Sequence, residues 1–343
     1  MYFPILFRMQ KLQSPYLLFL GDAPDQLAAK TATGIAQWRP DWCTGQLRLP
    51  DCHADLNLPD QTLAAAHTAG ARTLIIGVAN RGGAISDQWM ATLLDALDAG
   101  FDIANGLHDR LNHIPHLAQR AETLGRNLFD VRFPQVDLAV ANGRPRAGKR
   151  LLTVGTDCSC GKMFTALSIE REMKTRCMQV DFRATGQTGI LIAGTGISVD
   201  AVVADFIAGA VEYLTPAADF PDHWDLIEGQ GSLFHASYAG VSLGLMHGAQ
   251  PDCLVLCHEP TRTHMRGLPH YPIPELGDCI ALNLANAMLT NPECRMLGVS
   301  VNTSALSPEE ADRYLSETSA QLSLPCLDVM RGGADGFLDY LAG

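Results

Sequence analysis

Short apolar runs alternate with amphipathic segments along most of the chain, and this pattern predicts an α/β fold. The predicted strands are 16–20, 73–78, 101–104, 151–154, 179–182, 223–227, 253–257 and 296–301. The predicted helices are 23–36, 62–69, 86–98, 114–124, 164–174, 199–212 and 307–322. Glycine-rich turns follow many of the strands. Strands that alternate with helices form parallel sheets, and such sheets bind ligands at the carboxyl ends of their strands.

A basic segment containing glycine and proline interrupts this pattern near the middle of the chain. The segment 141–150 has the sequence ANGRPRAGKR and is the best candidate for a linker. With 343 residues, 47% of them hydrophobic, the chain is long enough to bury two cores. We therefore expect two α/β domains, residues 1–142 and 143–343.

Charge and composition narrow the range of partners. A formal net charge of −12 argues against nucleic acid or an anionic membrane as a partner, so an anionic ligand would need a local basic pocket. The ten cysteines are scattered, which fits a reducing cytoplasm. The apolar start, 1–7, lacks the features of a signal peptide, and either Met1 or Met9 is the native start. No apolar stretch is long enough to span a membrane. We expect small-molecule substrates and a homodimer or higher homo-oligomer.

The segment 151–165, LLTVGTDCSCGKMFT, has the order of a phosphate-binding P-loop: strand, glycine loop, lysine, helix. Glycines at both ends allow a tight turn, so that the loop N–H groups and the helix N-terminus face an anion. The lysine adds a full positive charge. The predicted cofactor-binding residues are Gly155, Thr156, Asp157, Cys158, Ser159, Cys160, Gly161, Lys162 and Met163.

This loop departs from the common P-loop in two respects. Five residues separate its glycines instead of four, and Met163 stands where Ser or Thr would hold Mg²⁺. The sequence therefore supports a phosphate cradle better than an ATPase, and Met163 gives no support to bound Mg²⁺. A covalent role for Cys158 or Cys160 remains an alternative, because a helix N-terminus lowers the pKa of a thiol.

Two glycine-rich segments after later strands are predicted to contact a ligand. The segment 183–189, RATGQTG, offers hydrogen-bond donors from Arg183, Thr185, Gln187 and Thr188. The segment 228–233, EGQGSL, begins with Glu228 at a strand end, where P-loop proteins place a metal ligand or a base. The structural alternative is a carboxylate that caps the next turn. The backbone from Gly229 to Ser232 offers N–H groups for an anion or oxyanion.

Other polar residues have both a functional and a structural interpretation. His235 and His258 are candidate general bases, because imidazole titrates near neutrality. Arg262 and Arg266 are suited to binding carboxylates. Cys253, Cys257 and His258 suggest a metal site, but their apolar run favours a buried strand. In the first half, the turns 81–83 and 105–108 either line a cleft or are plain turns.

The loop GTDCSCGK resembles the longer P-loop, GTDxxxGK, of dethiobiotin synthetase and related ATP-dependent ligases. Glu228-Gly229 resembles the metal-binding Glu-Gly of the same enzymes. This local likeness gives the alternative function, an ATP-dependent ligase or kinase. A nucleotide-binding regulatory protein without catalysis is a third hypothesis.

A wider set of motifs covers nearly the whole chain and resembles the DgcN-type D-glutamate N-acetyltransferase family. The motifs are KT at 30–31, WRP at 38–40, GVANRGG at 77–83, KM at 162–163, ATGQTG at 184–189, VDAV at 199–202, DF at 205–206, EGQGSL at 228–233 and His235. The resemblance implies an N-terminal Rossmann-like domain and a C-terminal P-loop NTPase-like domain. It also implies acetyl-CoA as donor and a D-amino acid, first of all D-glutamate, as acceptor. Met163 fits this family, whereas Ala236 replaces the proline expected there.

The chemistry of acyl transfer agrees with this resemblance. Coenzyme A carries a pyrophosphate and a 3′-phosphate, so a P-loop can hold it without hydrolysing it. Transfer to an amine needs a base and donors for the oxyanion. Glu228 or His235 is the predicted base. The predicted substrate-binding residues are Arg183, Thr185, Gln187, Thr188, Gln230, Gly231, Ser232 and Arg262.

Overall fold

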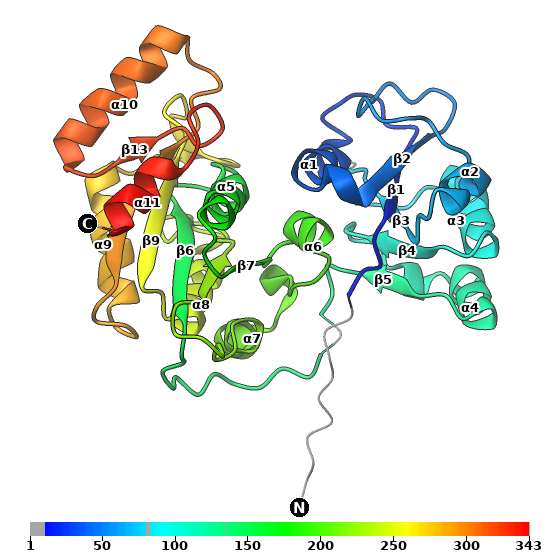
Figure 1. Cartoon of the computed structure of the whole chain (residues 1–343), viewed down its shortest axis with the longest axis horizontal. Helices are drawn as coiled ribbons and strands as arrows, with labels where there is room; N and C mark the ends of the chain where they lie inside the picture. The colour runs from blue at the N-terminus through cyan, green and yellow to red at the C-terminus, as the bar shows by residue number, and fades with distance from the viewer. Residues whose placement is uncertain (1–10, 80–82, 135, 343) are drawn as a thin grey trace, which may run out of the picture. The chain divides into compact units, whose positions relative to one another are not determined.

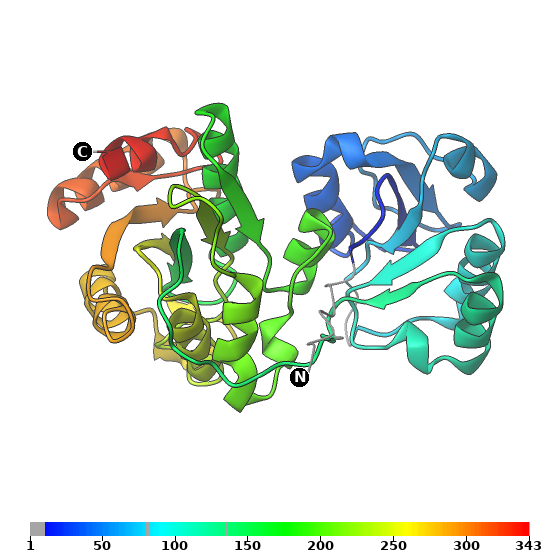
Figure 2. The same ribbon diagram turned by 60° about the horizontal axis from the view of Figure 1, so that its bottom comes forward.

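The structure is a computed structural model that describes residues 11–79, 83–134 and 136–342, arranged in two compact units (Figures 1 and 2). Unit 1 comprises Met1–Val136 and Gly186–Ala201, and unit 2 comprises Asp137–Thr185 and Val202–Gly343. Each unit contains a parallel sheet, as the alternation of strands and helices predicts. The domain boundary at 142/143 stays a prediction, because compactness does not show which segments fold independently.

Unit 1 is built on a five-stranded parallel sheet with the order β2-β1-β3-β4-β5. Its strands are β1 (Tyr16–Gly21), β2 (Cys43–Arg48), β3 (Thr73–Ile76), β4 (Asp102–Asn105) and β5 (Leu128–Asp130). Its helices are α1 (Lys30–Trp38), α2 (Leu63–Thr68), α3 (Asp87–Asp98), α4 (Pro115–Leu124) and α6 (Gln187–Ala193), with the short 3-10 turns η1 (Pro40–Trp42), η2 (Leu111–His113) and η3 (Val199–Ala201). Helices α1 and α6 lie on one face of the sheet and α3 and α4 on the other (Figure 1). Helices on both faces explain why β1 is buried along its whole length.

The first half departs from the predicted elements in three places. Helix α1 begins at Lys30 and not at residue 23, because the Asp25 carboxylate accepts the Ala28 N–H at 2.8 Å and holds a turn there. Strand β2 lies in the polar segment 39–59, where no strand is predicted. Its buried Gln46 donates a hydrogen bond to Asp55 at 2.9 Å, so this edge strand lacks the apolar run that marks the others. Strand β5 is too short to give a pattern.

The two turns predicted to line a cleft are partly described. Asn80, Arg81 and Gly82 lie outside the described residues. Gly83 contacts the second turn, since its C=O accepts the His108 N–H at 3.0 Å. Asn105 is buried and serves the fold, because its Nδ2 donates to the C=O of Asp109 at 2.6 Å.

Unit 2 contains a six-stranded parallel sheet with the order β13-β12-β9-β6-β8-β7 and an antiparallel hairpin, β10-β11. Its strands are β6 (Lys149–Gly155), β7 (Val180–Arg183), β8 (Trp224–Ile227), β9 (Cys253–His258), β10 (His264–Met265), β11 (Leu268–Pro272), β12 (Arg295–Val301) and β13 (Cys326–Leu327). Its helices are α5 (Lys162–Thr175), α7 (Ile207–Leu214), α8 (Ala239–Ala249), α9 (Leu276–Ala287), α10 (Pro308–Leu322) and α11 (Asp335–Ala342), with the 3-10 turn η4 (Ala204–Phe206). Leu151 of β6, Ile169 of α5 and Phe337 of α11 belong to one buried core cluster, which fixes α5 on the sheet.

Two predictions in the second half, one of a helix and one of a loop, are wrong. The segment 199–212 is not one helix, because it is divided into η3, η4 and α7. The segment 183–189 is not a single loop, since Gln187 begins α6, which belongs to unit 1. By contrast, α10 begins where predicted, because the Ser307 side chain accepts the Glu310 N–H in a capping box. Among the described residues, no helix has the length and apolar character needed to cross a membrane.

Candidate functional site

The P-loop of unit 2 has the predicted order, with β6 ending at Gly155 and α5 beginning at Lys162. A Cβ on Gly155 would lie 2.7 Å from Cys160 Sγ and 2.8 Å from the C=O of Asp157, so a side chain here would collide with the loop. Gly161 has a φ of 105°, in the left-handed region that favours glycine. Both glycines are therefore required by the backbone.

The loop presents unused backbone donors. Within the described part of the chain, no acceptor takes the backbone N–H groups of Ser159, Cys160 or Gly161. Met163 follows on the first turn of α5, where its thioether offers no hard oxygen ligand. The loop is therefore equipped to hold an anion and lacks the hydroxyl that would hold Mg²⁺ beside it.

Lys162 is buried at 7% exposure, and the hydrogen bonds described for its ammonium group go to the loop. Its Nζ donates to the C=O of Asp157 at 2.7 Å and lies 3.7 Å from Cys160 Sγ. The described residues place no carboxylate within ion-pair distance of it. An ammonium buried without a counter-charge is costly, so an anion in the loop would lower its energy.

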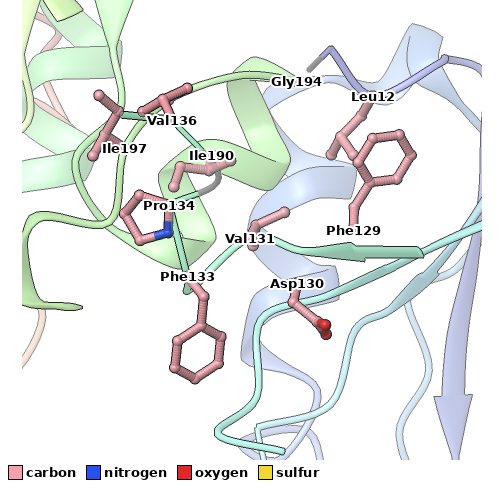
Figure 3. A pocket seen from close by; sticks show the side chains of 11 residues that line it. Leu12, Phe129, Asp130, Val131, Phe133, Pro134, Val136, Ile190, Gly194 and Ile197 are labelled. Atoms are coloured by element: carbon pink, nitrogen blue, oxygen red, sulfur yellow. The ribbon is translucent and has the colours of Figure 1, made fainter. Parts of the chain in front are cut away.

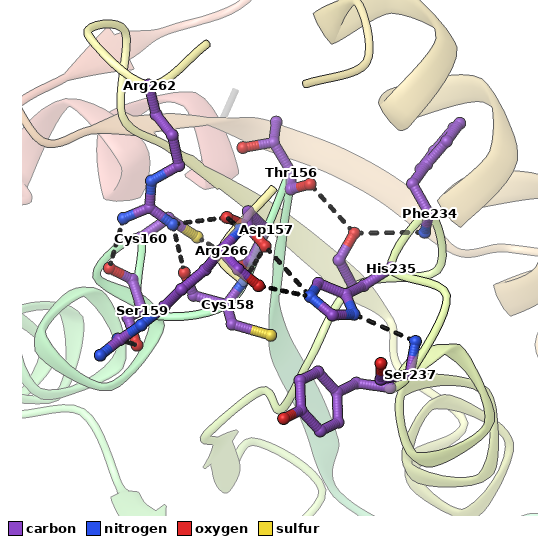
Figure 4. Close-up of polar contacts among 12 residues, drawn as sticks. Thr156, Asp157, Cys158, Ser159, Cys160, Phe234, His235, Ser237, Arg262 and Arg266 are labelled. Atoms are coloured by element: carbon purple, nitrogen blue, oxygen red, sulfur yellow. Dashed lines mark hydrogen bonds and ion pairs between the residues drawn. The ribbon is translucent and has the colours of Figure 1, made fainter. Parts of the chain in front are cut away.

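The carboxylate of Asp157 connects the loop to the segment after β9 (Figure 4). It is fully buried and accepts the Cys158 N–H at 2.6 Å, Arg262 Nη1 at 2.6 Å and the Arg266 N–H at 2.8 Å. Burial by itself raises the pKa of Asp157, but these hydrogen bonds, led by that of Arg262, hold the pKa below its ordinary value. Asp157 is therefore charged and shapes the cradle, and it is not free to bind a ligand.

Arg262 is also used by the loop itself. Its Nη1 donates to the C=O of Cys158 at 2.6 Å, and its Nη2 donates to the C=O of Ser159 at 3.4 Å and to Glu259. This guanidinium thus neutralises two carboxylates and binds two loop carbonyls. Its predicted role in binding substrate stays a prediction, and its position indicates that it orders the cradle.

His235 lies beside Asp157 with both ring nitrogens occupied (Figure 4). Its Nδ1 accepts the Ser237 N–H at 3.1 Å, and its Nε2 lies 3.1 Å from the C=O of Arg266. A carbonyl can only accept, so the proton is on Nε2 and the ring is a neutral tautomer. In this geometry the ring has no lone pair available for a substrate proton. Its described contacts fix the backbone of Arg266.

His258 is neutral and belongs to the buried end of β9. Its Nδ1 lies 3.1 Å from Thr156 Oγ1, and burial, assisted by the charge of Arg262, lowers its pKa to about 4. Cys253 and Cys257 are buried in the same strand, which confirms the strand interpretation. A different trio, Asp157, Cys158 and His235, brings metal-type ligand atoms within 4.8 Å of one another. Its Asp and His members already have the hydrogen-bond partners described above.

Glu228 follows β8 and is buried beside the cradle. Its Oε2 accepts the Thr185 N–H at 3.0 Å, and its own C=O accepts the Thr185 hydroxyl. Gln230 Nε2 donates to the same hydroxyl at 3.1 Å. The structure therefore brings together three predicted site residues from the ends of neighbouring strands β7 and β8.

The segment after Glu228 packs directly on the P-loop. A Cβ on Gly229 would lie 1.7 Å from the C=O of Thr153 and 3.0 Å from Lys162 Cδ, so only glycine fits. Ser232 Oγ donates to the C=O of Thr156 at 3.1 Å. The Gly229 N–H already donates to Thr153 Oγ1 at 3.0 Å and is therefore excluded from the predicted oxyanion donors.

The oxyanion donors that remain follow Gly229. The N–H groups of Gln230, Gly231 and Ser232 have no acceptor among the residues that the structure describes. Gly231 has a φ of 63°, and a Cβ there would lie 2.7 Å from Ser242 Oγ and 2.9 Å from the C=O of Tyr238, so the turn requires glycine. These three N–H groups are the donors that the segment can offer to an anion.

The remaining predicted residues pair with other side chains or belong to unit 1. Arg183 Nε donates to Asp225 at 2.6 Å and its Nη2 to Asp181 at 3.2 Å, an ion-pair cluster on β7 and β8. Gln187 and Thr188 belong to α6 of unit 1, where Gln187 packs on Gly106. Their predicted contact with substrate stays a prediction.

Unit 1 has a cavity of its own that is open to solvent (Figure 3). It is lined by Leu12, Phe129, Asp130, Val131, Phe133, Pro134, Val136, Ile190, Gly194, Gly196 and Ile197. The Asp130 carboxylate at its edge accepts the Leu111 N–H at 2.8 Å and Asn112 Nδ2 at 2.8 Å. The side chains that line the cavity are therefore mainly apolar, and the Asp130 carboxylate is used by the fold.

Sequence reasoning missed how Asp157 and His235 hold Arg266. The contacts join residues 109 and 31 positions apart, so no local spacing reveals them. The sequences of β6 and of the short hairpin β10-β11 do not indicate that the chain after β9 returns to the P-loop.

Comparison with known proteins shows the family to which this chain belongs. The chain matches family models for DUF1611, a domain of unknown function: the C-terminal P-loop domain over residues 139–338 and the N-terminal Rossmann-like domain over residues 48–134. A D-glutamate N-acetyltransferase from Tritonibacter scottomollicae is 57% identical over 96% of this chain and 99% of its own length. Another from a Pseudoalteromonas species is 47% identical over the same shares of both chains.

A solved structure shows the same fold. The crystal structure of a DUF1611 family protein from Anabaena variabilis ATCC 29413 has a TM-score of 0.83 and 34% identity, and the match covers 96% of this chain and 99% of that one. Both predicted domain types are thus confirmed, the Rossmann-like and the P-loop α/β domain. The chain belongs to the DUF1611 family.

Proposed function

We propose that this protein is an N-acetyltransferase that moves the acetyl group of acetyl-CoA to the amine of a D-amino acid, first of all D-glutamate. The observation that carries the proposal is the likeness to two D-glutamate N-acetyltransferases along nearly the full chain. The geometry of the P-loop supports it independently. We also expect the protein to work in a reducing compartment, the cytoplasm, because all ten of its cysteines are free thiols.

The cradle suits a coenzyme that is held and not hydrolysed. It offers unused N–H groups and the ammonium of Lys162, which has no carboxylate partner in the described structure. Coenzyme A supplies phosphates for both. Met163 removes the hydroxyl that normally places Mg²⁺ for phosphoryl transfer, and acyl transfer does not need it.

Acyl transfer from a thioester to an amine requires one proton acceptor. The ammonium must lose one proton before its nitrogen attacks the thioester carbonyl. The C–N bond then forms and the C–S bond breaks, and the second proton that the nitrogen loses goes to the departing sulfur, so that CoA leaves as thiol. Glu228 is our candidate acceptor, because its carboxylate lies beside the cradle and is oriented by the Thr185 N–H at 3.0 Å. His235 would first have to release Ser237 or Arg266.

The developing oxyanion needs hydrogen-bond donors. The N–H groups of Gln230, Gly231 and Ser232 are available in the described structure and lie in the segment that follows the candidate base. Donors aimed at developing charge in a site sheltered from water commonly supply the largest part of such catalysis. We therefore assign this turn to the oxyanion.

One assay separates this function from its alternatives. Purified protein is incubated with D-glutamate and acetyl-CoA, and free thiol is followed with a thiol-reactive dye. The proposal predicts thiol release that depends on D-glutamate and N-acetyl-D-glutamate as product. ADP formed from ATP and a carboxylate substrate, without thiol release, would favour the ligase or kinase. Nucleotide binding without turnover of either donor would favour a regulatory protein.

The assembly state is a separate measurement. We expect a homodimer or higher homo-oligomer, and light scattering after size-exclusion chromatography gives the mass directly. A mass near 37.0 kDa at assay concentration would contradict this expectation.

A further inference from the structure

Two buried side chains hold the main chain of Arg266 on both sides. The Asp157 carboxylate accepts its N–H at 2.8 Å, and His235 Nε2 donates to its C=O at 3.1 Å. Asp157 and His235 are 0% and 2% exposed. Removing these two polar groups from water costs free energy, which their hydrogen bonds to Arg266 offset. The arrangement therefore defines the position of Arg266.

The side chain of Arg266 then extends along the rim of the P-loop (Figure 4). Its Nη1 donates to the hydroxyl of Ser159, next to the Cys160 and Gly161 N–H groups that have no acceptor among the described residues. The residue is exposed, and within the described structure no carboxylate lies within ion-pair distance of its guanidinium. Arg262, four residues earlier, is instead paired with Asp157 and Glu259.

Lys162 inside the cradle and Arg266 on its rim are thus two cations without a described carboxylate partner. They are placed together in a protein with a formal net charge of −12. Such an arrangement favours a ligand with more than one anionic group. A guanidinium also matches phosphate oxygens in a bidentate geometry, which an ammonium cannot do.

We propose that Arg266 binds a phosphoryl group of the acyl donor outside the loop, and that His235 is a positioning residue that holds Arg266 there. The inference rests on the proposed function and refines it, since it makes the site specific for a phosphorylated thioester. The chemistry is shared by the 3′-phosphate and the diphosphate of coenzyme A, and the experiment distinguishes them.

The test compares three donors in Arg266→Met and in the wild type: acetyl-CoA, acetyl-dephospho-CoA and acetyl-pantetheine. Arg176→Met is the matched control, because Arg176 lies at the far end of α5 and pairs with Glu172 and Asp339. We expect Arg266→Met to raise KM for acetyl-CoA on the order of 10- to 100-fold, with kcat little changed. The same variant should use acetyl-pantetheine as well as the wild type does. Titration calorimetry with CoA should show the same loss of affinity.

Comparison of the three donors shows which phosphoryl group of coenzyme A Arg266 contacts. If Arg266 contacts the 3′-phosphate, the variant and the wild type use acetyl-dephospho-CoA equally well. If it contacts the diphosphate, the loss persists with acetyl-dephospho-CoA and disappears only with acetyl-pantetheine. Equal loss with all three donors, or unchanged KM and CoA affinity, would overturn the inference. A wild type that acetylates D-glutamate from none of them refutes the proposed function instead.

The positioning role of His235 has its own readout. His235→Gln keeps an amide N–H that can donate to the C=O of Arg266, whereas His235→Leu cannot donate. We expect His235→Leu to raise KM for acetyl-CoA with kcat retained and to leave acetyl-pantetheine unaffected, and His235→Gln to restore most of the affinity. A fall in kcat with every donor would instead make His235 the base and refute the positioning role.

Discussion

Replacement of Arg262 by Met tests the internal support of the cradle. Methionine keeps much of the apolar stem but removes the guanidinium that binds Asp157 and two loop carbonyls. The Asp157 carboxylate would then stay buried with only the N–H groups of Cys158 and Arg266. We expect the variant to fold and unit 2 to lose stability.

The size of the loss follows from the burial of the two partners. Removal of one partner of a buried ion pair costs about 3–5 kcal/mol, because the other charge is left uncompensated. The side chain of Asp157 is 1% exposed and that of Arg262 18%, so water partly replaces the guanidinium. We therefore expect a loss of about 3 kcal/mol, the low end of that range. Arg176→Met, which breaks an exposed pair, should cost much less.

The loss of folding stability in Arg262→Met should depend on pH. In the wild type the lowered pKa of Asp157 contributes stability that is present above its unfolded value of about 4 and is lost as pH falls through the folded value. Without Arg262, burial raises the pKa of Asp157, and protonation then relieves the buried charge. The difference between wild type and variant should therefore be larger at pH 8 than at pH 5.

Urea unfolding followed by circular dichroism at both pH values measures these differences. A double-mutant cycle with Asp157→Asn isolates the pairwise coupling, which we expect to be about 2 kcal/mol at pH 8. If Arg262→Met and Arg176→Met are equally stable, or the coupling energy is zero, the guanidinium does not support the loop.

Three further substitutions test other parts of the site. Lys162→Ala should raise KM for acetyl-CoA about 10- to 100-fold and leave the dependence on D-glutamate unchanged; equal loss for both substrates in steady-state kinetics would mean that the cofactor is misplaced. Gly229→Ala should prevent stable folding of unit 2, because its Cβ would lie 1.7 Å from a carbonyl oxygen, whereas Gly240→Ala in α8, with open space around it, should unfold at the same or higher temperature. Glu228→Gln should lower kcat at least about 100-fold with little change in the KM for acetyl-CoA, and a rate near that of the wild type would remove it as the base.

The sequence predicts the sheet cores and the P-loop well for a physical reason. Buried parallel strands such as β6 and β9 contain short runs of apolar residues, and the P-loop is one contiguous segment whose glycines are fixed by its own backbone. The edge strand β2 is polar and contains no apolar run that would mark it as a strand. Helix α6 is equally hard to predict, because its short glycine-containing segment resembles a ligand-binding loop.

The candidate site is only partly accessible to sequence reasoning. Glu228 is predicted because a strand end, an acid and a glycine-rich turn coincide in one stretch. Arg183 is predicted to bind substrate, yet it pairs with Asp225 on the neighbouring strand. His235 is predicted as a base, yet its two nitrogens are bonded to backbone groups. Such contacts depend on tertiary packing and leave no periodic signal.

The central claim is that the cradle holds an acetyl donor for transfer to a D-amino acid. The most direct test follows release of the CoA thiol with D-glutamate, with L-glutamate and without an acceptor, and identifies the product by chiral chromatography and mass spectrometry. The account predicts thiol release that requires D-glutamate and equals the N-acetyl-D-glutamate formed. Thiol release that does not depend on the amino acid, or none at all with acetyl-CoA and D-glutamate, would contradict it.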